Sequence, residues 1–254
     1  MIHLFALLSL LLCGVCYTGF QNSSHFHNTS NRRSLLLLVF GGALLLRLLL
    51  AYTTHGFSND IACFAAWADR IFTLGPGQFY SAEMFTDYPP GFMYVLYLIG
   101  ALRSLLQIPY YSDLHILLLK LPAILCDIAC GFLLYREAVK RLHFSDLQGI
   151  FAASAYLFQP AVILNSSCWG QVDSVYTLMI ILMCLFLMKG NLLPAYAVYG
   201  LGVLLKPQML IFTPVLLAGI WDHVFLQDFS WRKFFYNLCG GLVVICGMLL
   251  LCAP

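Results

Sequence analysis

The sequence contains little charge. Only 9% of its 254 residues are Asp, Glu, Lys or Arg, whereas 61% are hydrophobic. Soluble domains carry about 25% charged residues, so this composition excludes a soluble globular domain and indicates a polytopic membrane protein. The formal net charge is only +2 and no basic cluster occurs, so we expect no nucleic-acid partner.

The motifs of several binding sites are also missing. No Walker motif and no Gly-x-Gly-x-x-Gly pattern occurs, which argues against a nucleotide site. No tight cluster of carboxylates or histidines supports a metal site, so we expect no cofactor, although the sequence leaves the involvement of a divalent metal open. The ten cysteines lie mostly inside apolar runs, and we interpret them as small packing residues.

The sequence does contain long apolar runs separated by short polar segments. These runs predict an all-α bundle of membrane helices. The expected membrane helices cover residues 1–20, 34–54, 113–135, 148–164, 174–188, 192–205, 209–225 and 234–252. Together they form one transmembrane domain over residues 1–254. Because an apolar run extends almost to Pro254, we expect the chain to be the N-terminal part of a longer module.

Lysine and arginine near the ends of these runs predict the orientation of the helices, because short loops rich in positive charge stay in the cytoplasm. On this rule Arg32-Arg33, residues 136–141 and Arg232-Lys233 lie inside. The inside position of residues 136–141 requires that the short apolar segment 91–106 does not cross the membrane. Residues 55–112 then form one long outer loop.

Three polar islands reach the non-cytoplasmic face in this topology. They are Ser58-Asn59-Asp60, residues 165–173 and Lys206-Pro207-Gln208. A carboxylate at the bilayer centre costs about 2.5–3.5 kcal/mol, so we expect Asp173 at a helix end that faces water or a polar cavity. Lys206-Pro207 interrupts a helix, which favours a binding role and is the single helix break that the sequence predicts.

The outer loop begins with a short amphipathic helix. Ser58 is a favourable N-cap, and the helix should end before Gly75-Pro76. Asp60 lies at its N-terminal end, where the carboxylate either supports the helix dipole or belongs to a site. The apolar residues fall on one face, which predicts a helix lying on the membrane surface. This face consists of Ile61, Phe64, Ala65, Ala68, Ile71 and Phe72.

Later in the loop, two prolines stiffen the segment Asp87-Tyr88-Pro89-Pro90-Gly91. Each proline fixes its own φ angle and drives the preceding residue into an extended conformation. Such a segment sets the position of its neighbours, so Asp87 is either a turn former or a site residue.

Three charged residues lie within apolar segments: Arg47, Lys120 and Asp127. Charged residues in such segments usually face a bundle interior or a cavity. Lys120 and Asp127 are seven residues apart, so they share a helix face but are too far apart to pair directly. Arg47 and Lys120 belong to the outer half, where they either snorkel to the interface or form a cationic wall that holds a lipid phosphate.

These residues and motifs together resemble bacterial mannosyltransferase-like membrane proteins. Such proteins are relatives of the enzyme that adds the second mannose of GPI anchors, and they belong to the GT-C class of polytopic glycosyltransferases. The resemblance spans roughly residues 40–220, and Trp-Gly-Gln-Val-Asp-Ser (169–174) is its most specific part. The other parts are Asp60, Asp-Tyr-Pro-Pro-Gly (87–91), Lys120 with Asp127, and Lys-Pro-Gln (206–208).

The resemblance implies an integral, multi-pass hexosyltransferase that uses a polyprenyl-phosphate-linked sugar donor. Its acceptor, a glycan or a lipid, lies on the non-cytoplasmic face, and an Asp of the first outer loop acts as the base. Carried onto this chain, that Asp is Asp60. Members of the family are generally longer than this chain.

The expected chemistry assigns roles to the remaining candidates. A carboxylate can deprotonate the acceptor hydroxyl, and Lys206, Lys120 or Arg47 can stabilise the departing phosphate. Aromatic side chains can stack on sugar rings, and polar ones can bind hydroxyl groups. The substrate-binding candidates are Asp87, Tyr88, Trp169, Gln171, Asp173 and Gln208.

Two alternatives stay open at this stage. A transporter or flippase of a lipid-linked substrate would use the same cationic cavity without bond chemistry, and it predicts internal repeats with broken helices in matching halves. The sequence shows one break and no evident repeat. The second alternative is an inactive, truncated relative. The sugar, the acceptor and the anomeric outcome are left open.

Overall fold

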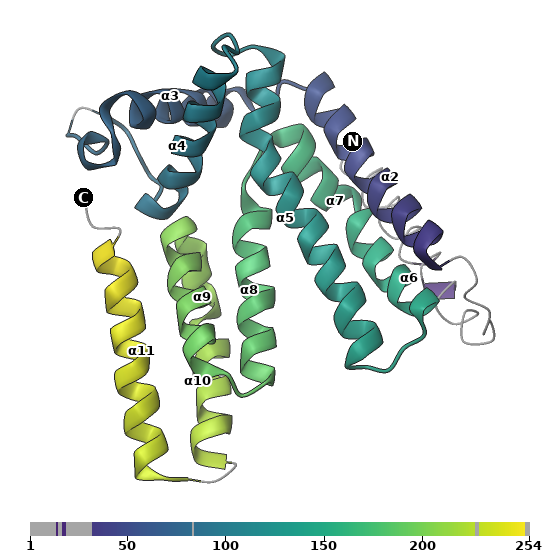
Figure 1. The fold of residues 1–254 in the computed structure, drawn as a ribbon, viewed down its shortest axis with the longest axis vertical. Helices are drawn as coiled ribbons and strands as arrows, with labels where there is room; N and C mark the ends of the chain where they lie inside the picture. The colour runs from purple at the N-terminus through teal and green to yellow at the C-terminus, as the bar shows by residue number, and fades with distance from the viewer. Residues whose placement is uncertain (1–13, 15–16, 19–31, 83, 227–228, 252–254) are drawn as a thin grey trace. The chain divides into compact units, whose positions relative to one another are not determined.

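The computed structural model describes residues 14, 17–18, 32–82, 84–226 and 229–251 (Figure 1). Within these residues the chain forms 10 α-helices and no strand, which confirms the predicted all-α class. The membrane helix expected over residues 1–20 lies almost entirely outside the described residues.

The chain divides into two compact units, which are described separately. The first unit consists of Met1–Ala65 and Ile108–Ser174, and the second of Ala66–Gln107 and Val175–Pro254. Helix α3 (Ser58–Leu74) contributes residues to both units, and helix α8 (Asp173–Met188) begins at the end of the first and continues in the second.

The first unit is built on three helices that pack against one another: α2 (Arg32–Thr53), α5 (Asp113–Lys140) and α6 (Asp146–Leu157). Ser112 caps α5, and Ser145 with Gln148 forms a capping box that starts α6. One apolar cluster of this unit consists of Val39, Ala43, Tyr135, Ile150, Ala153 and Leu157. Helix α5 is longer than the expected 113–135, because its basic C-terminal residues continue the helix instead of forming a loop.

The helix expected over residues 148–164 is broken, so that prediction is wrong. Helix α6 stops at Leu157, and the chain restarts as α7 (Pro160–Ile163), which runs into the π-helix Leu164–Trp169. The two parts are bent by 51°. Pro160 explains the break, since proline disfavours a helical residue before it and supplies no backbone N–H.

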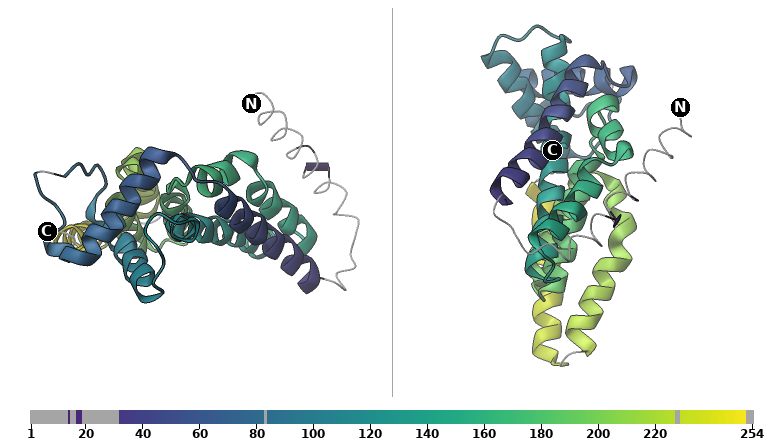
Figure 2. Two further views of the ribbon diagram at one scale, coloured as in Figure 1. Left: turned by 90° about the horizontal axis from the view of Figure 1, so that it is seen from above. Right: turned by 90° about the vertical axis from the view of Figure 1, so that its right-hand side faces the viewer.

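The second unit contains α4 (Pro90–Leu105), most of α8, α9 (Leu192–Leu205), α10 (Thr213–Trp221) and α11 (Trp231–Leu251). Helices α9 and α11 pack together, and α10 and α11 run antiparallel (Figures 1 and 2). The segment expected as one helix over residues 209–225 has three parts, because a 3₁₀ turn (Pro207–Phe212) precedes α10 and a π turn (Asp222–Leu226) follows it. The core includes Met183, Leu192, Tyr196, Met209 and Leu216.

Helix α3 confirms the predicted short helix and its end before Gly75. Its first hydrogen bond runs from Ile61 N to Phe57 O at 3.1 Å, so Ser58 lies one position inside the helix and is not its cap. The predicted apolar face is buried in the protein, with Ile61, Ala65 and Ala68 at 0% exposure. The expectation that this face lies against the membrane surface is therefore wrong.

In the part of the chain that the structure describes, four helical segments are long and apolar enough to cross a membrane: Arg32–Thr53, Asp113–Lys140, Pro207–Leu226 and Trp231–Leu250. The bent pair Asp146–Leu157 and Pro160–Trp169 makes a fifth if it forms one span. These segments make a multi-pass membrane protein plausible. Helices α4, α8 and α9 have 16, 16 and 14 residues, which at about 1.5 Å per residue falls short of about 30 Å of hydrocarbon. Helix length therefore does not distinguish α4, which was predicted not to cross the membrane, from α8 and α9, which were predicted to cross it. The topology stays a prediction.

Candidate functional site

Asp60 is the third residue of α3 and is partly exposed. Trp169 Nε1 donates a hydrogen bond to Asp60 Oδ2 at 3.2 Å, and Gln171 Nε2 donates to the same oxygen. Among the described residues no hydrogen bond reaches Asp60 Oδ1. One carboxylate oxygen is thus held in place while the other stays available as an acceptor.

The backbone that brings Trp169 and Gln171 to Asp60 is a tight turn after the π-helix. Gly170 adopts a left-handed conformation with φ 89° and ψ 22°, and Asn165 O accepts from both Gly170 N and Gln171 N. A Cβ on Gly170 would lie 2.6 Å from Ile61 Cδ1. Only glycine fits both the positive φ and the close approach to α3.

A second contact ties this turn to the residues before α3. Phe57 N donates to Trp169 O at 2.8 Å, and the rings of Phe57 and Trp169 lie 5.3 Å apart. A Cβ on Gly56 would lie 2.7 Å from Trp169 O. The Trp-Gly-Gln motif and the start of α3 therefore form one local structure, in which the indole of Trp169 stays 50% exposed.

Asp173 is in the first turn of α8 and does not contact Asp60 through any hydrogen bond given by the structure. Asn165 Nδ2 donates to Asp173 Oδ2 at 2.9 Å, which fastens the π-helix to the start of α8. The predicted position of Asp173 at a helix end is confirmed.

Arg47 and Asp127 form an ion pair in the first unit, with 3.2 Å between Nε and Oδ2 and 0% exposure of both side chains. Ser166 Oγ and Ser174 Oγ donate to Asp127 at 2.6 and 2.5 Å, and Tyr156 OH donates at 3.2 Å. The sequence analysis missed the roles of these three hydroxyl groups. For the two serines the sequence did contain a hint, because Ser166 lies inside the polar island of residues 165–173 and Ser174 directly follows it.

Lys120 is also fully buried. Its Nζ donates to Thr54 O at 2.6 Å, to Ala51 O at 3.1 Å and to Thr54 Oγ1 at 3.1 Å. It therefore satisfies carbonyl groups at the C-terminal end of α2, where a cation is favourable. Both Arg47 and Lys120 bind protein groups here, and their predicted contact with a lipid phosphate stays a prediction.

Lys206 lies in the second unit, in an extended conformation at the end of α9. Its Nζ lies 5.6 Å from the centre of the Tyr88 ring and 5.8 Å from that of Tyr176, which is cation–π range. The Tyr88 ring also contacts the Trp67 indole at 5.7 Å. A Cβ on Gly91 would lie 2.6 Å from Leu204 O, so α4 begins directly against the end of α9.

The fold of the second unit thus brings together two motifs that are more than a hundred residues apart in sequence, Asp-Tyr-Pro-Pro-Gly and Lys-Pro-Gln. Within them Asp87 and Gln208 are exposed, whereas Lys206 is 8% exposed. The prediction that Asp60, residues 169–173 and Lys206 share one cavity stays a prediction for Lys206, which belongs to a different unit from Asp60.

Among the described residues no group of three or more His, Cys, Asp or Glu side chains is placed to hold a metal ion. In comparisons with known proteins, no protein-family model matches the chain and no curated protein is similar to it. A functional proposal therefore rests on the geometry of two groups of residues: Asp60 with Trp169 and Gln171, and Lys206 with Tyr88 and Tyr176.

Proposed function

We propose that the chain is a membrane glycosyltransferase of the GT-C class. It transfers a hexose from a polyprenyl-phosphate donor to a glycan or lipid acceptor on the non-cytoplasmic face. The family resemblance implies that this hexose is mannose-like. The observation that carries the proposal is the Asp60 carboxylate, which is anchored through Oδ2 by Trp169 and Gln171 and has Oδ1 open.

In the proposed reaction, Asp60 Oδ1 accepts the proton of the acceptor hydroxyl. The acceptor oxygen then bonds to the anomeric carbon of the sugar, and the bond from that carbon to the phosphate oxygen breaks. Polyprenyl phosphate leaves with the electron pair. A positioned general base of this kind contributes about 10²–10⁴-fold to the rate.

The anchoring bonds support this role because they restrict the carboxylate without consuming both of its oxygens. The exposed indole of Trp169 offers a face on which a sugar ring can stack. Gln171, by contrast, serves mainly to hold Asp60, and Asp173 holds the π-helix through Asn165.

In the second unit, the Lys206 cluster supports a phosphate-binding role. The ammonium group is nearly buried against two tyrosine rings, where the low dielectric strengthens its attraction for an anion. Asp87, Tyr88 and Gln208 belong to the two motifs that meet at Lys206, and we assign them to the donor. Arg47 and Lys120 are assigned to holding the helices, since their polar contacts are with protein groups.

The test is transfer of a labelled sugar from a polyprenyl-phosphate donor in liposomes by an Asp60→Asn variant. The amide oxygen of asparagine can still accept the bonds from Trp169 and Gln171, so folding should be preserved while the base is lost. We expect the transfer rate to fall by about 10²–10⁴-fold. Asp113→Asn is the matched control, because Asp113 is an exposed carboxylate in the first turn of a helix and its contact with His55 is 3.6 Å long. A rate for Asp60→Asn within twofold of the control would eliminate Asp60 as the base.

A transporter or flippase of a lipid-linked substrate is the second candidate, and one observation favours it. The first unit contains a helix that is broken at Pro160 and bent by 51°, a break that the sequence analysis did not predict. Transporters place binding sites at such breaks. Movement of the donor across liposomes without release of polyprenyl phosphate, and at equal rates in wild type and Asp60→Asn, would support this candidate against the transferase.

A further inference from the structure

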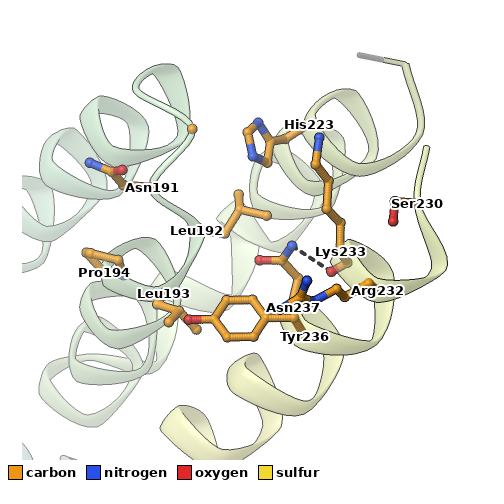
Figure 3. A pocket seen from close by; sticks show the side chains of 11 residues that line it. Asn191, Leu192, Leu193, Pro194, His223, Ser230, Arg232, Lys233, Tyr236 and Asn237 are labelled. Atoms are coloured by element: carbon orange, nitrogen blue, oxygen red, sulfur yellow. Dashed lines mark hydrogen bonds between the residues drawn. The ribbon is translucent and has the colours of Figure 1, made fainter. Parts of the chain in front are cut away.

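The second unit contains a cavity of about 700 Å³ between the beginnings of α9 and α11. Its lining includes three basic side chains, His223, Arg232 and Lys233, and no acidic one among the residues the structure describes. The Lys233 side chain extends toward His223 (Figure 3). No residue of the proposed transferase site lines this cavity, so it calls for a separate explanation.

The starts of two helices border the cavity. Neither α9 nor α11 has an acidic residue in its first turn, and Asn191, which precedes α9, makes no side-chain capping bond. The first N–H groups of a helix lack partners within the helix and carry partial positive charge. Basic side chains beside two helix starts repel these charges, and a bound anion would remove the repulsion.

The hairpin of α10 and α11 carries a cluster of exposed aromatic residues beside the cavity. Successive ring centres lie 4.6 Å apart for Trp221 and Phe225, 5.6 Å for Phe225 and Phe229, and 5.1 Å for Phe229 and Trp231. These four side chains are between 36% and 66% exposed. Exposed tryptophan and other aromatic residues gather at the level of the lipid headgroups, which places the cavity at that depth.

An apolar groove of about 320 Å³ adjoins the cavity, and Asn237 lines both. The groove runs between α9, α10 and α11, and its lining includes Tyr196, Leu216, Leu242 and Ile245. A basic cavity that shares a lining residue with an apolar groove matches a ligand with an anionic head and a hydrocarbon tail.

We propose that this cavity and groove bind one anionic phospholipid, with its phosphate beside Arg232 and Lys233 and one acyl chain in the groove. The positive-inside rule assigns Arg232-Lys233 to the cytoplasmic face, whose leaflet is rich in anionic lipid. Basic pockets between membrane helices on that side characteristically hold lipid phosphates. The site is independent of the transferase activity and lies in the second unit alone.

The experiment measures thermal unfolding of the purified chain in detergent while phosphatidylglycerol or phosphatidylcholine is added. Phosphatidylglycerol should raise the unfolding temperature in a saturable manner, because a ligand that binds only the folded state stabilises it. In an Arg232→Gln/Lys233→Gln variant the apparent affinity should fall about 30-fold, since each basic residue near an anionic lipid contributes about a factor of five. The matched control is Arg33→Gln/Lys140→Gln, which removes two exposed positive charges in the first unit.

Two further measurements test whether binding requires the acyl chain in addition to the anionic headgroup. Leu242→Trp narrows the groove at an exposed position, so it should weaken phosphatidylglycerol binding while Arg232 and Lys233 remain. Inorganic phosphate, tested alone at the same concentrations, should not reproduce the stabilisation. The proposal is overturned if phosphatidylcholine stabilises equally, if the Arg232→Gln/Lys233→Gln variant retains the effect, or if inorganic phosphate or the Leu242→Trp variant gives the full wild-type response.

Discussion

The buried ion pair between Arg47 and Asp127 gives the sharpest quantitative prediction. Both side chains are fully buried, and Asp127 accepts hydrogen bonds from four side chains in addition to carrying the counter-charge. Removing one partner of such a pair leaves an uncompensated charge and costs about 3–5 kcal/mol. We therefore expect Asp127→Asn to lower the free energy of unfolding by that amount, since the asparagine keeps the volume but not the charge.

The Arg47→Met variant should lose a similar amount, because it leaves the carboxylate without a cation. The double variant Arg47→Met/Asp127→Asn contains neither charge, and its amide can still bond to the hydroxyl groups of Ser166, Ser174 and Tyr156. Its loss should fall short of the sum of the single losses by about 2–3 kcal/mol.

The assay is thermal unfolding in detergent, followed by tryptophan fluorescence and circular dichroism. A loss of 3–5 kcal/mol corresponds to a fall of about 6–20 °C in the unfolding temperature for a chain of this size. The same cycle on the exposed pair His55 and Asp113 should show coupling below about 1 kcal/mol. Additive losses at Arg47 and Asp127, or an Asp127→Asn variant as stable as wild type, would refute the reasoning.

Three further predictions test the local structures. Gly170→Ala should lower the free energy of unfolding by about 1–3 kcal/mol, because alanine disfavours the positive φ and its Cβ would lie 2.6 Å from Ile61 Cδ1; an unchanged unfolding temperature would contradict this. Lys206→Met should lower stability by about 0.5–2 kcal/mol while Lys206→Arg retains most of it, since arginine keeps the cation–π contacts; a methionine variant as stable as wild type would show that the ring contacts contribute nothing. In intact cells, an impermeant thiol reagent should label Tyr110→Cys but not Leu142→Cys, both introduced into a variant without other accessible cysteines. Both positions are exposed, so each cysteine can react if the reagent reaches it. The opposite labelling pattern would reverse the predicted topology.

The sequence determined the features that depend on local pattern. Apolar runs of helical length predicted the all-α class, and the polar residues that interrupt them identified Asp60, residues 165–173 and Lys206 as unusual positions. The end of α3 at Leu74 followed from Gly75 and Pro76, because glycine and proline stop helices through their own backbone geometry. Such signals act within a few residues, so they can be read without knowledge of the fold.

The tertiary structure decided which distant groups became partners. Asp127 pairs with Arg47, 80 residues earlier, whereas the sequence showed only that Lys120 shares its helix face at too great a distance to pair. Asp60 is held by Trp169 and Gln171, which are 109 and 111 residues away, because Gly170 allows the turn to approach α3. The same long-range packing buried the apolar face of α3 inside the protein. Hydrophobic periodicity shows that a face must be covered, but the covering surface is set by how the helices pack, and that depends on contacts between residues far apart in the chain.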